Sequence, residues 1–131
     1  MNQREMGSMG EELAQDFLKH RGYKILETNF LCRFGEADII ATCDGELSFI
    51  EVKTRGQELF GSPSDAVTYK KRKHIYKVAE FYLYKHQIVD IPISLDVIEV
   101  YLLNEGKPRI VHLRNAIIDK PEYTKRYGYH S

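Results

Sequence analysis

Three charged side chains close to a short turn are the residues of this chain best suited to chemistry. Asp44-Gly45 lies between two apolar runs, a pattern typical of a two-residue hairpin turn. In that register Asp38 falls opposite Glu51, with Cβ atoms roughly 5 Å apart. Lys53 follows Glu51 by two residues and therefore shares its face of the strand. The pattern predicts two carboxylates and an ammonium group on one face of a hairpin.

Two neighbouring carboxylates on a sheet need compensation. At this separation they repel by roughly 3 kcal/mol at an effective dielectric constant near 20. A divalent cation would offset the repulsion, since Asp38, Glu51, the Val52 carbonyl and water form an oxygen-donor set suited to Mg²⁺ or Mn²⁺. Lys53 would then stabilise negative charge that develops on a phosphate. The residues alone therefore favour metal-assisted phosphate chemistry.

The same charges also have a simpler interpretation, as the solvated face of an amphipathic hairpin. Glu36 falls opposite Lys53 in this register, where the two would form a weak surface salt bridge. The other face would hold the core residues Ala37, Ile39, Ile50 and Val52. Both interpretations depend on the two-residue turn, because a longer loop would shift the register.

A single small α/β domain is expected to position these residues, since 131 residues correspond to about one domain. Hydrophobic periodicity and turn residues predict helices over 8–21 and 65–86 and strands over 23–32, 36–42, 47–53, 92–103 and 109–113. The second helix has an apolar stripe of Val67, Ile75, Val78, Ala79, Tyr82 and Leu83. This α-β-β-β-α-β-β order predicts a mixed central sheet flanked by helices. The domain would span 1–117, followed by a polar tail over 118–131.

Composition excludes several classes of protein. Lys and Arg number 19 and so do Asp and Glu, which argues against a generic polycationic DNA binder. Cys32 and Cys43 form no CxxC pair, which excludes a disulfide scaffold and a zinc ribbon. The chain has no secretory signal and no apolar run long enough to span a membrane, so a cytoplasmic protein without membrane partners is expected.

An ordered set of motifs carries a family resemblance. Asp38 followed by Glu51-Val52-Lys53 resembles the D…E-x-K signature of the restriction-endonuclease-like nuclease superfamily, whose core has a similar element order. Over roughly residues 7–113 the chain resembles the YraN-like family of small uncharacterised bacterial proteins, relatives of Holliday junction resolvases. The landmarks are Gly10-Glu11, Ala14, Gly22-Tyr23, Asn29, Gly35-Glu36-Ala37-Asp38, Glu51-Val52-Lys53-Thr54-Arg55, Phe60-Gly61-Ser62-Pro63, Lys71 and Ala79. Ala37 stands where the family usually has Ile or Val.

The resemblance implies a restriction-endonuclease-like fold and a divalent-metal-dependent nuclease acting on DNA, with structured or branched DNA as the expected substrate. Asp38 and Glu51 would hold the metal with the Val52 carbonyl, and Glu11 would assist directly or through water. Lys53 would be the catalytic lysine, and Glu36 would orient it or hold a second metal. Cutting two strands would require two sites, so a homodimer is expected for resolvase-like action. Glu11 has an alternative interpretation, because Ser8-x-x-Glu11 is a capping-box pattern.

A basic stretch supplies the expected contacts with nucleic acid. Residues 53–77 hold seven Lys or Arg against two acids, so zero net charge conceals a dipolar distribution. The expected contacts are Arg55, Lys70, Lys71 and Lys73. A solvated helix face is the alternative for Lys70, Lys73 and Lys77, whereas Lys71 falls on the apolar stripe. The competing functions are a nucleic-acid-binding module or partner adaptor that does not cleave, and a structural domain with an incidental acidic pair.

Overall fold

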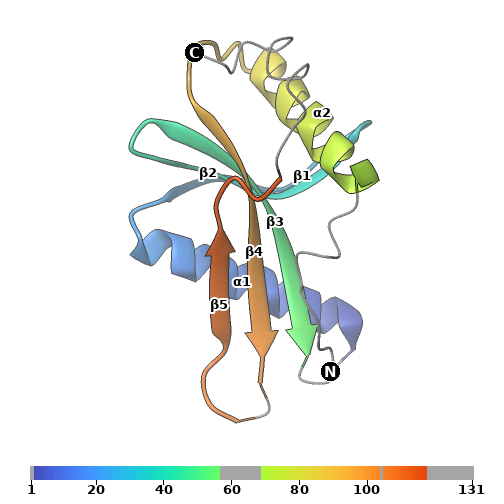
Figure 1. The fold of residues 1–131 in the computed structure, drawn as a ribbon, viewed down its shortest axis with the longest axis vertical. Coiled ribbons are helices and arrows are strands. Elements are labelled where there is room, and N and C mark those ends of the chain that lie inside the picture. Colours follow the sequence, from blue (N-terminus) through green and yellow to red (C-terminus); the bar gives the residue numbers. More distant parts are fainter. Residues whose placement is uncertain (1, 57–68, 104, 118–131) are drawn as a thin grey trace.

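The computed structural model describes residues 2–56, 69–103 and 105–117, with the backbone alone for 69–73. Its elements are α1 (Gln3–His20), β1 (Lys24–Cys32), β2 (Gly35–Cys43), β3 (Glu46–Gly56), α2 (Tyr69–Lys85), β4 (Ile93–Leu102) and β5 (Arg109–Leu113) (Figure 1). The predicted element order is confirmed. The expected helical residues 65–68, the loop motif at 60–63 and the tail over 118–131 lie outside the described residues.

The five strands form one mixed sheet in the order β1-β2-β3-β4-β5. Three of the four pairings are antiparallel, and β3 pairs with β4 in parallel. Two parallel neighbours cannot be joined by a tight turn, so the chain must cross over between them, and α2 lies within this connection. The predicted mixed α/β architecture is therefore confirmed. None of the described helices is long and apolar enough to cross a membrane.

The two helices pack against separate apolar clusters of the sheet. Ala14 and Leu18 of α1 join a buried cluster with Ile39, Ala41, Ile50, Ile98 and Val100. The described residues of the predicted α2 stripe are buried in a second cluster, which also includes Ile40, Leu47, Phe49, Leu95 and Val97. Val67, the first residue of that stripe, lies outside the described residues. Consecutive strand residues thus enter opposite clusters, as in a sheet that is covered on both sides. The expectation of one core face and one polar face on the hairpin is wrong.

The hairpin turn is the one the sequence predicts. Asp44 and Gly45 both have positive φ, as a type I′ turn requires. The pairs run from Cys43 with Glu46 to Ile39 with Ile50, which is the expected register. There the β2–β3 pairing ends, whereas β3 continues beside β4 to the pair Gly56 with Leu102. Alternation is also disturbed here, since Ala37 joins the α2 cluster while Ile39 joins the α1 cluster.

Helix α1 begins earlier than predicted. Asn2 is its N-cap, the Asn2 side chain accepts a hydrogen bond from the Glu5 N–H at 2.8 Å, and the two residues form a complete capping box. The predicted capping box at Ser8 and Glu11 is wrong, because both residues lie inside the helix. The same sequence pattern occurs at Asn2, six residues earlier, and satisfies the free N–H groups there. Glu11 is therefore not explained by capping.

A close helix–strand contact fixes α1 against β3. Gly10 is buried, and a Cβ added to it would lie 1.9 Å from Thr54 Oγ1 and 2.9 Å from Thr54 Cβ. Only glycine leaves room for the Thr54 side chain at this crossing. Because Glu11 follows Gly10, this contact also sets the position of the Glu11 carboxylate.

We therefore predict that Gly10→Ala lowers the free energy of unfolding by about 1–3 kcal/mol, because the added methyl group overpacks the Thr54 contact. Denaturant unfolding followed by circular dichroism measures the loss. Adding Thr54→Ala removes two of the three clashing atoms and should restore part of the stability, giving a non-additive double-mutant cycle. Additive losses would show that this contact does not fix the helix.

Candidate functional site

Asp38 and Glu51 are both buried where the β2–β3 pairing ends. Their exposed fractions are 8% and 6%, so the solvated-face interpretation is wrong for these two acids. Asp38 Oδ2 accepts a hydrogen bond of 2.7 Å from the Val52 backbone N–H. With β2 no longer paired to β3 at this level, a side-chain oxygen replaces the strand carbonyl that would otherwise accept this bond. The end of the ladder thus holds a carboxylate between the two strands.

The charge on Asp38 is strongly disfavoured. Burial is the largest cause and the neighbouring charge of Glu51 the next, and together they raise the pKa of Asp38 to about 7. The hydrogen bond from Val52 opposes this rise, whereas the charges of Glu11 and Glu36 add to it. Four acids therefore act on one place in the molecule, and an added cation there would be favourable.

Lys53 is held beside the acid pair by Glu51. Lys53 Nζ lies 3.7 Å from Glu51 Oε1, and about a fifth of the lysine side chain is exposed. The expected pairing of Glu36 with Lys53 across the hairpin is wrong. In the register of the sheet, Lys53 lies beside Glu99 of β4, and the exposed Glu36 lies opposite Leu31 of β1. The cause is the separation of β2 from β3, which carries Lys53 away from Glu36.

Glu11 reaches the site from α1. Its Oε1 accepts a hydrogen bond of 3.0 Å from Asn29 Nδ2 on β1, which fixes the orientation of the carboxylate. Asn29 has a φ of 50°, in the left-handed region that Asn tolerates better than most residues. The sequence marked Asn29 only as a landmark of the resemblance and did not indicate this contact. Acids from α1 and β3 therefore both raise the pKa of Asp38 on β2.

The donor set of the site decides whether it fits a divalent metal. Within the described residues, no three or more His, Cys, Asp or Glu side chains are grouped closely enough to hold a metal ion. In this arrangement Glu11 and Glu36 therefore do not complete a set of carboxylate ligands. The two buried carboxylates remain, with the predicted Val52 carbonyl, and all three are the hard oxygen donors that Mg²⁺ and Mn²⁺ prefer. Such a site leaves several positions for water or phosphate oxygens.

The expected basic contacts are only partly described. Arg55 is half-buried on β3, and its charge lowers the pKa of Glu99 against the larger effect of burial, which raises it. Lys70, Lys71 and Lys73 belong to the beginning of α2, and their side chains lie outside the described part of the chain. The expectation that Lys71 faces the apolar stripe stays a prediction.

Comparison with known proteins identifies the family. The sequence profile of the Uncharacterised protein family UPF0102 matches residues 10–100, which include Glu11, Asp38, Glu51 and Lys53. The chain belongs to this family. The match confirms the resemblance to the YraN-like proteins.

Similar proteins extend the match over most of the chain. A UPF0102 protein of Clostridioides difficile is 47% identical over 116 residues, which cover 88% of this chain and 99% of the relative. One from Caldicellulosiruptor saccharolyticus is 46% identical over 119 residues, covering 91% and 93%. One from Caldanaerobacter subterraneus is 41% identical over 118 residues, covering 88% and 97%. The UPF0102 relationship thus reaches beyond the candidate site to the whole fold.

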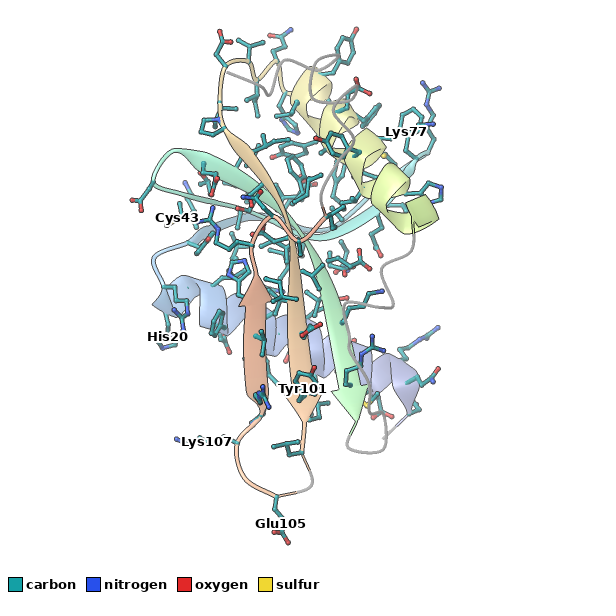
Figure 2. All side chains as sticks on the ribbon, viewed as in Figure 1. His20, Cys43, Lys77, Tyr101, Glu105 and Lys107 are labelled. Carbon is teal, nitrogen blue, oxygen red and sulfur yellow. The ribbon has the colours of Figure 1, made fainter. Side chains whose placement is uncertain are left out.

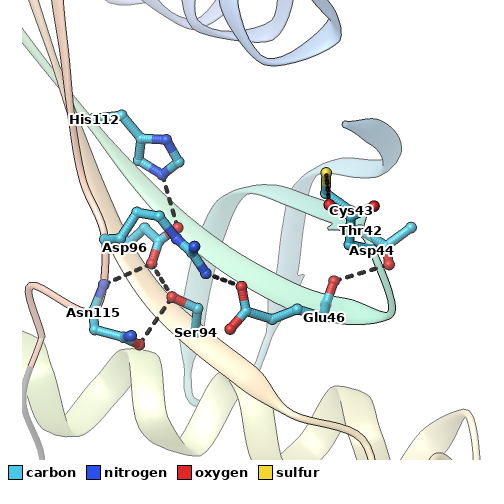
Figure 3. Close-up of polar contacts among 9 residues, drawn as sticks. Thr42, Cys43, Asp44, Glu46, Ser94, Asp96, His112 and Asn115 are labelled. Carbon is cyan, nitrogen blue, oxygen red and sulfur yellow. Dashed lines mark hydrogen bonds and ion pairs between the residues drawn. The ribbon is translucent and has the colours of Figure 1, made fainter. Parts of the chain in front are cut away.

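A second polar cluster of this UPF0102 protein was not found from the sequence. Asp96 is fully buried in β4, and its carboxylate accepts hydrogen bonds from the Asn115 N–H at 2.9 Å and from the Ser94 hydroxyl (Figure 3). The other Asp96 oxygen lies 2.8 Å from His112 Nε2, and Tyr23 and Phe17 pack edge-on against the His112 ring. The signal in the sequence was two polar residues, Ser94 and Asp96, at alternate positions of a largely apolar strand.

The Asp96 cluster has the composition of a catalytic triad but not its geometry. Ser94 and His112 each contact Asp96, and among the described residues the serine hydroxyl has no hydrogen bond to a histidine base. The interactions instead connect β4 to β5 and to the turn at Asn115. We interpret this cluster as a buried structural connection rather than a second active site.

The raised pKa of Asp38 predicts how stability depends on pH. The carboxyl ionises near pH 3.8 when unfolded and near 7 when folded, so ionisation destabilises the fold progressively over this interval. In EDTA at pH 8, Asp38→Asn should raise the free energy of unfolding by about 1–4 kcal/mol, the upper value corresponding to the full pKa difference. Near pH 4 the gain should vanish. Urea melts at both pH values measure it, and an equal gain at both would contradict the assignment.

Proposed function

We propose that this chain is a divalent-metal-dependent nuclease that hydrolyses phosphodiester bonds of DNA, structured or branched DNA above all. The observation that carries the proposal is the buried pair Asp38 and Glu51 at the end of the β2–β3 ladder, with Lys53 held beside it. Two buried carboxylates without a cation cost stability, and a fold that serves only structure would gain by removing one.

The architecture supports a restriction-endonuclease-like core over residues 1–117. An antiparallel meander of three strands is followed by a crossover containing α2 and by a parallel fourth strand, and the two helices pack on separate apolar clusters. In this arrangement Asp38 and the sequence Glu51-Val52-Lys53 meet where the second and third strands separate. This proximity supports the D…E-x-K arrangement that the resemblance implies.

Each site residue has a role that its contacts suggest. A bound Mg²⁺ or Mn²⁺ would polarise the phosphate and lower the pKa of water. Asp38, oriented by the Val52 N–H, and Glu51 would hold it with the Val52 carbonyl. Glu51 also positions Lys53, whose partly exposed ammonium group can donate to a phosphate oxygen as negative charge develops.

The two remaining acids act from the edge of the site. Glu11, oriented by Asn29, would hold water or the cation from the α1 side. Glu36 is exposed, and among the described residues no ion pair joins it to Lys53, so its proposed role is reduced to a second cation or to water. Cutting both strands of a junction would require a homodimer that presents two such sites.

A non-catalytic nucleic-acid-binding module or partner adaptor is the second candidate. One observation favours it: among the described residues, no group of three metal-ligating side chains is present. A site with two carboxylates would bind a cation weakly unless a phosphate supplied further oxygens. Binding and cleavage must therefore be measured separately.

Metal binding is tested first by a readout other than activity. Mg²⁺ or Mn²⁺ should raise the melting temperature of the natural protein, because binding to the folded state alone stabilises it. Asp38→Asn should abolish this rise, whereas Asp90→Asn, a matched change in an exposed loop, should leave it intact. A metal-induced rise that survives Asp38→Asn would place the metal elsewhere.

Cleavage is tested on labelled duplex, single-stranded, flap and four-way-junction DNA in Mg²⁺, Mn²⁺ or EDTA. Lys53→Ala should reduce the rate by roughly 10²–10³-fold, because it removes a charge that stabilises the transition state. Lys107→Ala is the matched control, since Lys107 is exposed in the turn between β4 and β5, where Figure 2 labels it. Equal rates in Lys53→Ala and the control would refute the nuclease assignment of this site. Retarded DNA without cutting would favour the binding module.

A further inference from the structure

Two cations from distant parts of the sequence meet on one aromatic ring. The guanidinium carbon of Arg33, in the β1–β2 turn, lies 4.9 Å from the centre of the Phe34 ring. Lys77 Nζ, on α2, lies 5.8 Å from the same centre. The two charges are therefore no more than about 11 Å apart. We call Arg33, Phe34 and Lys77 the Phe34 surface.

The charges of the Phe34 surface are accessible. Arg33 and Lys77 are both exposed, and Figure 2 shows Lys77 on the outer side of α2. Among the described residues, no ion pair joins Arg33 or Lys77 to an acid. The negative face of the Phe34 ring attracts both cations but carries no net charge. An anion is the partner that would complete this arrangement.

The Phe34 surface lies close to the acid pair. Gly35 follows Phe34, and a Cβ added to it would lie 3.5 Å from Val78 and 3.7 Å from His74, so α2 packs directly over the start of β2. Asp38 is four residues beyond Phe34, which corresponds to roughly 13 Å of extended chain. That length spans neighbouring phosphates along one DNA strand. A strand whose phosphate lies at Asp38 and Glu51 would extend over Arg33 and Lys77.

Two further basic positions lie along the backbone of α2. Lys73 and Lys70 precede Lys77 by four and seven residues, and positions with this spacing lie on the same side of a helix. The line of basic positions thus runs from the β1–β2 turn along α2. The sequence marked only the basic run, because Arg33 is separated from Lys77 by 44 positions and is brought there by the packing of Gly35 under α2.

We propose that the Phe34 surface binds the phosphate backbone of the DNA that enters the candidate active site. This inference rests on the proposed function and names the surface that holds its substrate. The guanidinium group suits phosphate by its fork of donors, and the ammonium group acts as a point charge. Neither contact reads base edges, so the surface binds without sequence preference. The Phe34 surface holds the DNA strand on one side of the acid pair.

Fluorescence anisotropy tests the surface with labelled duplex, single-stranded and four-way-junction DNA and with single-stranded RNA. EDTA prevents metal-dependent cleavage during the measurement. Arg33→Ala combined with Lys77→Ala should weaken binding to DNA roughly 10-fold or more and lower the slope of log K against log salt by about 1–2. Arg33→Lys combined with Lys77→Arg keeps both charges and should retain affinity within about threefold. Thermal melts confirm that each variant folds.

Lys85→Ala is the matched control. Lys85 is also exposed, lies on the same helix and stands over an aromatic ring, with Nζ 5.7 Å from the Phe30 centre. It is eight residues beyond Lys77, and its loss should change affinity less than twofold. An equal loss in this control, an unchanged affinity in the double alanine variant, or no DNA binding at all would overturn the proposal. Poly-glutamate of equal charge competing as strongly as DNA would overturn the assignment to nucleic acid.

The outcomes separate this inference from the proposed function. Cleavage that is lost in Lys53→Ala but unchanged by substitution of Arg33 and Lys77 would support the nuclease and refute the role of the Phe34 surface. DNA binding that depends on Arg33 and Lys77, without any cleavage, would support the role of the Phe34 surface and refute the nuclease activity. RNA bound more tightly than every DNA would keep the phosphate surface and change the substrate class.

Discussion

The separation of β2 from β3 after the pair Ile39 with Ile50 is the constraint on which the candidate site depends. Beyond that pair β3 remains bound to β4, and its Val52 N–H donates to the Asp38 carboxylate instead of to a strand carbonyl. A regular ladder would have used that N–H and left no place for a buried acid between the strands. The unfavourable burial of Asp38 beside Glu51 is thus a consequence of how the sheet divides. The hydrogen bond from Val52 offsets part of that cost.

Local patterns predicted the elements well and the long-range choices poorly. Asp44-Gly45 fixes the turn and the first five pairs, because positive φ at both positions is a local property. At Lys53, β3 is paired with β4 and no longer with β2. This choice depends on the apolar residues of β4, and no pattern near the hairpin contains that information. The predicted register was therefore extended too far, and Glu36 was placed opposite Lys53, which lies beside Glu99 of β4. The prediction that Asp38 and Glu51 are neighbours does not depend on this extension, because both residues lie at the point where the strands separate.

Side-chain contacts between elements were the least accessible from sequence. Gly10 predicts nothing by itself, yet its missing side chain lets Thr54 of β3 approach and so sets where α1 lies. Asn29 orients Glu11 from a strand that is 18 residues away. Asp96 and Ser94 belong to a strand whose other residues are largely apolar, and their partners His112 and Asn115 come from a later strand and turn. Each contact joins segments that only the folded sheet brings together.

A chain of zero net charge that acts on a polyanion must separate its charges in space. The acids near Asp38 would repel a phosphodiester, and a cation between Asp38 and Glu51 would reverse the sign only at the point of reaction. The flanking phosphates of the same strand would still meet the exposed Glu36. Arg33 and Lys77, held on Phe34 at the start of the strand that carries Asp38, supply positive charge where those phosphates must lie. Because Phe34 directly precedes β2 and Asp38 lies within it, this one short strand would fix the distance between the surface that holds the substrate and the site that cuts it.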